Sequence, residues 1–196
     1  MVTGVKPGAT TVLAQSGSKI GTATVTVVSA FNLRDQGLTV SGSNGWDGDF
    51  TCALDEAGAA WCWGNNLAGQ LGDGTTVSRT QPTKVVGDVR FTNITATDGT
   101  TCGLAVEGDI YCWGGGWGQL GNGTNSSSSI PVRVTTTEKF RSVSAGHNHV
   151  CAVTSDDEAY CWGSGFEGQL GTGDWGQGAQ KNVPTKIALS AKVQSL

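Results

Sequence analysis

Residues 112–121 read Cys-Trp-Gly-Gly-Gly-Trp-Gly-Gln-Leu-Gly, and two further parts of the chain carry almost the same letters. One has Cys-Trp-Gly at Cys62–Gly64 and Gly-Gln-Leu-Gly at Gly69–Gly72; the other has them at Cys161–Gly163 and Gly168–Gly171. Successive Trp-Gly pairs lie 50 and 49 residues apart. A period of about 20 to 50 residues is typical of proteins in which every copy is one small structural unit. The chain therefore contains three copies of one unit.

Each copy contains four short runs of β-forming residues separated by Gly, Asn and Asp, which favour turns. In the second copy we expect strands at about 91–97, 101–105, 109–113 and 131–135. Four short strands per repeat are typical of a β-propeller blade. We therefore expect an all-β fold with three four-stranded propeller repeats, at about 38–90, 91–139 and 140–196.

The composition agrees with a β fold and argues against several classes of partner. Gly supplies 31 of the 196 residues, and only 14% of the residues are charged. With a net charge of -4, the chain has no basic field that would attract nucleic acid or anionic membranes. No apolar run approaches the roughly 18 residues of a spanning helix, so we expect no membrane insertion.

The six cysteines fall into three pairs of constant spacing. These pairs are Cys52 and Cys62, Cys102 and Cys112, and Cys151 and Cys161. Closely spaced C-x2-C pairs, which zinc sites and thioredoxin-like redox sites use, are absent from the sequence. Metal binding and redox chemistry therefore do not explain the spacing.

A disulfide across the hairpin of the second and third strands does explain it. With Cys52 opposite Cys62, residues 56–58 form a three-residue loop whose last position, a glycine, needs a left-handed backbone. The equivalent positions hold Gly108 and Asp157, and both residue types accept that conformation more readily than most. The cysteines then form a non-hydrogen-bonded pair, where opposing strands approach most closely. We expect three disulfides; buried free thiols are the alternative.

The Trp-Gly and Gly-Gln-Leu-Gly signatures resemble the regulator of chromosome condensation repeat, over about residues 38–196. The resemblance implies a propeller, seven-bladed in that family. His149 matches a histidine that the family often has before its second strand, although the first two copies lack it. A cysteine pair in every blade departs from the family's eukaryotic members and indicates a bacterial, extracellular type.

Residues 1–30 resemble the last strands of a group-two bacterial immunoglobulin-like domain, in the runs Pro7–Val12 and Gly21–Val27. Residues 31–37 are expected to link this sandwich remnant to the repeats. The first residues contain no export signal. Because propellers commonly need about four to eight blades, we expect either a segment of a longer protein or self-association through open blade edges.

The sequence offers no arrangement typical of a catalytic or metal site. His147 and His149 lie two residues apart without a third ligand. Asp47 and Asp49 flank a glycine, but the rest of a calcium-binding loop is missing. We therefore expect no enzymatic activity, no cofactor and no metal. The tryptophans that recur in register are expected to pack between blades: Trp63, Trp113 and Trp162.

The three copies differ in the loops expected at one end of the blades. The first copy has extra residues before its first cysteine, including Trp46, Asp47 and Phe50. The middle copy has Trp117 in a glycine-rich loop, and the third has an insertion that contains Trp175. Exposed aromatics are typical of carbohydrate platforms and of protein hot spots, so these five residues form a candidate binding face. The alternative is that the tryptophans pack against their own blades.

These observations favour a non-catalytic segment of a bacterial surface or secreted protein. We expect a role in adhesion, ligand binding or self-assembly, with a protein or a cell-surface glycan as partner. The family resemblance adds two alternatives. One is a secreted inhibitor similar to β-lactamase inhibitory propellers, and the other is a guanine-nucleotide exchange factor, which the net charge and the cysteine pairs oppose.

We expect reduction to raise the intact mass of the chain by two hydrogens for each of three disulfides, because each cysteine pair lies across its own hairpin. Chain-entropy arguments assign about 2 to 3 kcal/mol of stability to each bridge. Mass spectrometry after alkylation without reductant, with a reduced sample as control, measures the thiols. Alkylation of all six cysteines in the unreduced sample would contradict the disulfides.

Overall fold

A computed structural model of the chain describes residues 8–16, 19–27, 33–41 and 49–189. The chain divides into two compact units, Met1–Asn32 and Leu33–Leu196. In the first unit, β1 (Gly8–Ser16) and β2 (Lys19–Val27) form an antiparallel hairpin, paired from Gly8 with Val27 to Ser16 with Lys19.

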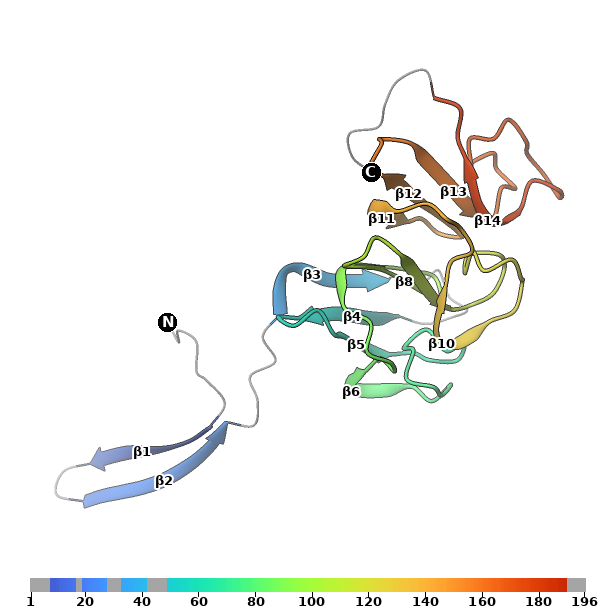
Figure 1. The fold of residues 1–196 in the computed structure, drawn as a ribbon. Helices are drawn as coiled ribbons and strands as arrows, with labels where there is room; N and C mark the ends of the chain where they lie inside the picture. The colour runs from blue at the N-terminus through green and yellow to red at the C-terminus, as the bar shows by residue number, and fades with distance from the viewer. Residues whose placement is uncertain (1–7, 17–18, 28–32, 42–48, 190–196) are drawn as a thin grey trace. The chain divides into compact units, whose positions relative to one another are not determined.

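The second unit contains three antiparallel sheets of four strands each, and each sheet is formed by strands that are consecutive in the sequence (Figure 1). The first blade has β3 (Leu33–Ser41), β4 (Phe50–Asp55), β5 (Ala60–Gly64) and β6 (Arg79–Lys84). The second has β7 (Phe91–Thr97), β8 (Thr100–Ala105), β9 (Ile110–Gly114) and β10 (Ser128–Arg133). The third has β11 (Phe140–Ala145), β12 (His149–Thr154), β13 (Ala159–Gly163) and β14 (Lys181–Lys186).

The predicted all-β fold of three four-stranded blades is confirmed. The described residues contain no helix, and so none that could cross a membrane. The fourth strand of the second blade begins at Ser128, three residues before the predicted start at 131, because it continues past an irregularity in its pairing between Ser128 and Val132.

The hairpin of the second and third strands has the predicted geometry in every blade. Cys52 pairs with Cys62, and the equivalent cysteines pair in the other two blades. Each pair has its Cα atoms 4.1 Å apart and its sulfurs at bonding distance. The predicted left-handed positions are confirmed, with φ of 80° at Gly58, 82° at Gly108 and 65° at Asp157.

Phe50 corrects the sequence interpretation, because only 2% of its surface is exposed and it belongs to the core instead of a binding face. It lies opposite Gly64 at the end of the hairpin, where a Cβ atom on the glycine would lie 2.7 Å from the Cα of Phe50. Phe50 also shares one side of β4 with Cys52 and Leu54, since residues two apart in a strand point the same way.

Each core cluster is shared between two neighbouring blades. One combines residues of the first blade with Phe91 and Trp113 of the second. The other combines residues of the second blade with Phe140 and Trp162 of the third. Trp113 and Trp162 are fully buried, which confirms the predicted packing between blades, whereas Trp63 of the first blade is only half-buried.

The last glycine of each Gly-Gln-Leu-Gly run makes this packing feasible. A Cβ atom on Gly72 would lie 2.7 Å from Nε1 of Trp113, and one on Gly121 would lie 2.7 Å from Nε1 of Trp162. Trp162 Nε1 also donates a hydrogen bond to the carbonyl of Gln119, at 2.8 Å. The Gly-Gln-Leu-Gly run of one blade therefore forms the surface against which the tryptophan of the next blade packs.

The replacement Gly121→Ala is expected to lower the free energy of unfolding more than Gly173→Ala. Both glycines have a positive φ, but a Cβ on Gly173 would meet nothing within 4 Å. Overpacking against Trp162 should therefore cost about 1–3 kcal/mol beyond the shared backbone strain. Urea unfolding of both variants measures the difference. Equal losses would show that the glycine is needed only for its backbone conformation.

Candidate functional site

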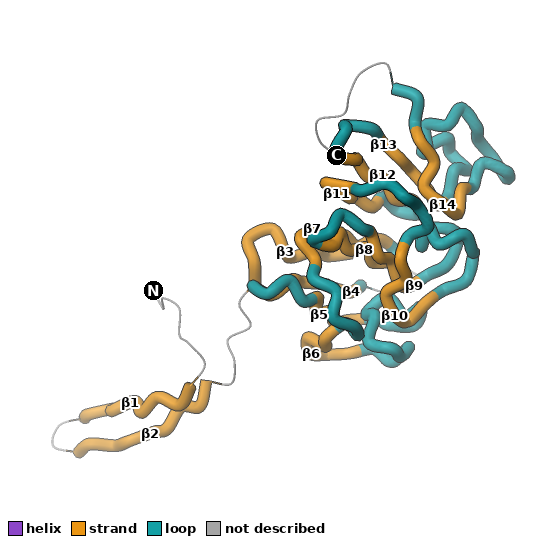
Figure 2. Tube along the Cα trace, in the orientation of Figure 1, coloured by secondary structure: helices purple, strands orange, loops and turns teal. Residues whose placement is uncertain are grey.

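The longest loops of the second unit join the third strand of each blade to its fourth (Figure 2). We call them the long loops; they comprise residues 65–78, 115–127 and 164–180. Because the strands run up and down, the long loops leave the same end of the blades as the turns between first and second strands. The cysteine hairpins close at the other end.

Every long loop presents a large apolar side chain at one register, the third residue after the Trp-Gly pair. These residues are Leu67, Trp117 and Phe166, with 68%, 77% and 55% of their surfaces exposed. Sequence reasoning selected Trp117 alone and missed the other two. An alignment of the three copies on their Trp-Gly pairs places Leu67 and Phe166 at the same position as Trp117. A search for unusual tryptophans does not find them.

Two different arrangements hold these side chains in place. In the first blade the preceding residue, Asn66, is buried, and its Nδ2 donates to the carbonyls of Thr75 and Val77, both at 3.1 Å. In the other two blades a glycine stands at the position of Asn66, and backbone atoms of the same long loop fill the space that a side chain would occupy. A Cβ on Gly116 would lie 2.1 Å from the carbonyl carbon of Ser126, and the glycine of the third blade is similarly packed.

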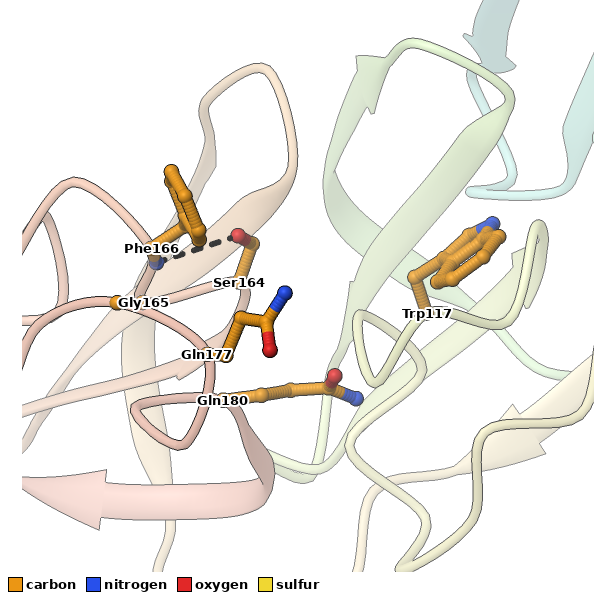
Figure 3. Close-up of a pocket in the computed structure, with 7 residues that line it drawn as sticks. Trp117, Ser164, Gly165, Phe166, Gln177 and Gln180 are labelled. Carbon is orange, nitrogen blue, oxygen red and sulfur yellow. Dashed lines mark hydrogen bonds between the residues drawn. The ribbon is translucent and has the colours of Figure 1, made fainter.

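A groove of about 390 Å³ lies where the second blade meets the third (Figure 3). Trp117 contributes one wall. The remaining lining residues belong to the third long loop: Ser164, Gly165, Phe166, Gly176, Gln177 and Gln180. A second hollow of about 250 Å³ shares Trp117, Ser164 and Gln180 with the groove and adds Asn148. All these side chains are uncharged.

Hydrogen bonds between the two blades position two amides of the groove, those of Gln180 and Asn148. Gln180 Nε2 donates to Oδ1 of Asn125 at 2.8 Å. Gln119 Nε2 donates to Oδ1 of Asn148 at 3.2 Å, and within the third blade the carbonyl of Asn148 accepts from the backbone of Ser164 at 2.8 Å. The groove therefore rests on contacts that exist only when both blades are present.

Of the five residues of the predicted binding face, those that the structure describes lie in different surroundings. Trp46 and Asp47 lie outside the described residues, and Phe50 is buried in the first blade. Trp117 lines the groove. Trp175 is 83% exposed in the third long loop but does not line the groove.

The two histidines lie in different surroundings. Nδ1 of His147 is 2.8 Å from Oδ2 of Asp98, so this pair links the second and third blades. His149 is half-buried, and burial lowers the pKa of its imidazole. Among the residues with described side chains, no three His, Cys, Asp or Glu side chains gather as metal ligands would.

The model of the regulator of chromosome condensation (RCC1) repeat matches the chain at residues 57–104, 107–153 and 156–195. A second model of this repeat matches residues 140–169. A search of curated proteins finds no match.

Several solved structures are similar to the chain. Human WBSCR16 is 23% identical with a TM-score of 0.63, over 70% of this chain and 35% of that one. Prp20p from Saccharomyces cerevisiae, described with its binding to Gsp1p and histones, is 26% identical with a TM-score of 0.62, over 72% of this chain and 36% of that one. Yeast RCC1 (Prp20) bound to Kap60 is 25% identical with the same TM-score, over 72% of this chain and 35% of that one. The chain thus spans about a third of the length of these structures.

The replacement Trp117→Phe is expected to remove emission that acrylamide quenches readily, because the ring of Trp117 is open to solvent. The matched variant Trp162→Phe should remove emission that acrylamide reaches poorly, since Trp162 is fully buried. Stern–Volmer plots of both variants measure the accessible fraction, with circular dichroism as the check on folding. An unchanged accessible fraction in Trp117→Phe would contradict its exposed position.

Proposed function

Because the chain belongs to the regulator of chromosome condensation repeat family, we propose that it is a non-catalytic binding segment of a larger propeller. The segment works outside the cell, as part of a bacterial surface or secreted protein, and binds a protein or a cell-surface glycan. The observation that carries the proposal is the row of Leu67, Trp117 and Phe166, one exposed apolar side chain per blade at the same register.

Repetition argues that this row is a surface for binding. A single exposed apolar side chain is ordinary on a protein surface and needs no explanation. Three at one register, on loops that otherwise differ in length and sequence, extend along one end of three blades. Large apolar and aromatic groups are the usual anchors of binding surfaces, because they bury much area when a partner covers them.

The disulfides support an extracellular setting. Five of the six cysteines are buried and Cys151 is half-buried, and the disulfides of the first two blades are part of the cores that join the blades. Disulfides persist in oxidising compartments and are rare in the cytosol. Residues 1–30 would then be the end of an immunoglobulin-like spacer that precedes the propeller.

The solved relatives support a macromolecular partner. Prp20p is described as binding Gsp1p and histones, and yeast RCC1 is seen bound to Kap60. These proteins share the propeller fold with this chain, whose own partner its loops would select. We propose that the long loops make this selection, since they differ most among the three blades.

Guanine-nucleotide exchange is a second candidate, favoured by the likeness to Prp20p, which is described with its binding to Gsp1p. Exchange would be measured as the release of a fluorescent nucleotide from a small GTPase. The disulfides of all three blades oppose this candidate, because small GTPases work in the reducing cytosol.

The triple variant Leu67→Ala, Trp117→Ala, Phe166→Ala is expected to lose binding to arrayed cell-surface proteins and glycans by tenfold or more, since hot-spot truncations each cost roughly 2 kcal/mol. The matched control is Val106→Ala, which truncates an exposed apolar residue at the hairpin end of the second blade. Equal loss in both proteins, or no ligand for the unaltered chain on either array, would contradict the proposed role.

A further inference from the structure

We propose that the groove between the second and third blades binds a neutral saccharide, with Trp117 and Phe166 facing the apolar sides of the sugar rings. This inference rests on the proposed binding function and names the ligand class of one site. The groove combines two exposed aromatic rings with three side-chain amides, from Asn148, Gln177 and Gln180.

The size of the groove suits a short oligosaccharide. Its volume of about 390 Å³ lies near the lower end of small-molecule sites, which commonly measure about 300–1,000 Å³. The adjoining hollow of about 250 Å³ continues from Trp117 towards Asn148. A linear ligand of a few rings can therefore extend from one hollow into the other.

The charge of the lining excludes ionic recognition. Every lining side chain is neutral, so a phosphate, sulfate or carboxylate would lose its hydration without gaining a counter-charge. The basic groups next in sequence to the lining residues Gln180 and Asn148 have acidic partners: Lys181 Nζ lies 3.0 Å from Oδ2 of Asp174, and His147 pairs with Asp98. Glu167, exposed beside Phe166, adds a negative charge that disfavours anions further.

The free hydrogen-bonding atoms match hydroxyl groups. Gln180 uses its Nε2 on Asn125, and Asn148 uses its Oδ1 on Gln119. Within the part of the chain whose side chains are described, this leaves the Oε1 of Gln180 as an acceptor and the Nδ2 of Asn148 as a donor. A sugar hydroxyl can both donate and accept, so neighbouring hydroxyls can satisfy an acceptor and a donor together.

The structure favours a saccharide over a peptide strand. A peptide that binds by strand addition needs the unpaired backbone groups of a sheet edge, whereas this groove is lined by loops and side chains. A sugar ring has C–H groups on its faces and hydroxyls around its rim. That pattern matches two aromatic side chains surrounded by amides.

The groove is also held in shape before a ligand arrives. Gly116 and Gly165, which precede the two aromatic residues, pack so tightly that a Cβ would lie 2.1 Å from the backbone of Ser126 in one case and 2.3 Å from that of Ala179 in the other. The amides of Gln180 and Asn148 are fixed by hydrogen bonds between blades. Little ordering is then needed on binding, which favours affinity for small ligands.

Titration of the full chain with neutral oligosaccharides tests the inference. Cello-, chito- and malto-oligosaccharides are the probes, with sulfated and sialylated glycans as the charged comparison. We expect at least one neutral series to shift the indole N–H resonance of Trp117 in a saturable manner. Saturation by anionic glycans alone, or competition by a proline-rich peptide with no response to any sugar, would overturn the saccharide assignment.

Two variants locate the site. Trp117→Ala is expected to weaken saccharide binding about tenfold or more, as loss of an aromatic anchor usually does. Trp175→Ala is the matched control, because Trp175 is a more exposed tryptophan on the third long loop that does not line the groove, and it should change affinity less than about twofold. Equal loss in both variants would overturn the groove as the site.

The failure of this inference can be distinguished from the failure of the proposed function. If the long-loop triple variant loses a protein ligand while no neutral sugar binds the unaltered chain, the binding role stands and the saccharide assignment is wrong. If neither proteins nor sugars bind the long-loop end, both are wrong.

Discussion

The contact between a glycine of one blade and the tryptophan of the next is the constraint on which the second unit depends. Gly72 and Gly121 have no side chain, and the indoles of Trp113 and Trp162 occupy the space that a Cβ would take. A four-stranded blade cannot bury both of its faces alone, so each core is completed by the following blade. The two halves of the repeat signature are therefore partners across a blade boundary.

The disulfides fix the opposite end of the same arrangement. In each blade the cysteine pair links the second and third strands, and in the first two blades the turn of this hairpin accepts a hydrogen bond from the first strand of the next blade. Phe91 N donates to the carbonyl of Gly58 at 2.8 Å, and Phe140 N to that of Gly108 at 2.9 Å. With the hairpin ends secured in this way, the long loops are free to differ in sequence. Such a division between a rigid scaffold and variable loops is common where loops carry function.

The groove follows from differences between neighbouring copies. The second long loop has glycine where the first has Asn66, and the third is lengthened around Trp175. These changes place a ring from one blade opposite amides from the next, with Gln180 bonded across the boundary to Asn125. Strict repetition would have produced equal junctions, whereas variation makes the junction of the second and third blades a neutral, aromatic site.

The amino-acid sequence by itself determined the repeat, the all-β fold, and the opposition of each cysteine pair with a left-handed residue at the turn, including Asp157. These features depend on period and on contacts within one hairpin, which are local in sequence. Only the tertiary structure decided which aromatics are exposed. Phe50 looked like a surface residue beside Trp46, but it is buried in the core that the first two blades share. Leu67 and Phe166 were recognised as candidate binding residues only once their exposure at the same register as Trp117 was known. The groove brings together Trp117 of the second blade and Gln180 of the third. Such a site has no signature in a single stretch of sequence, because the packing of one blade on the next creates it.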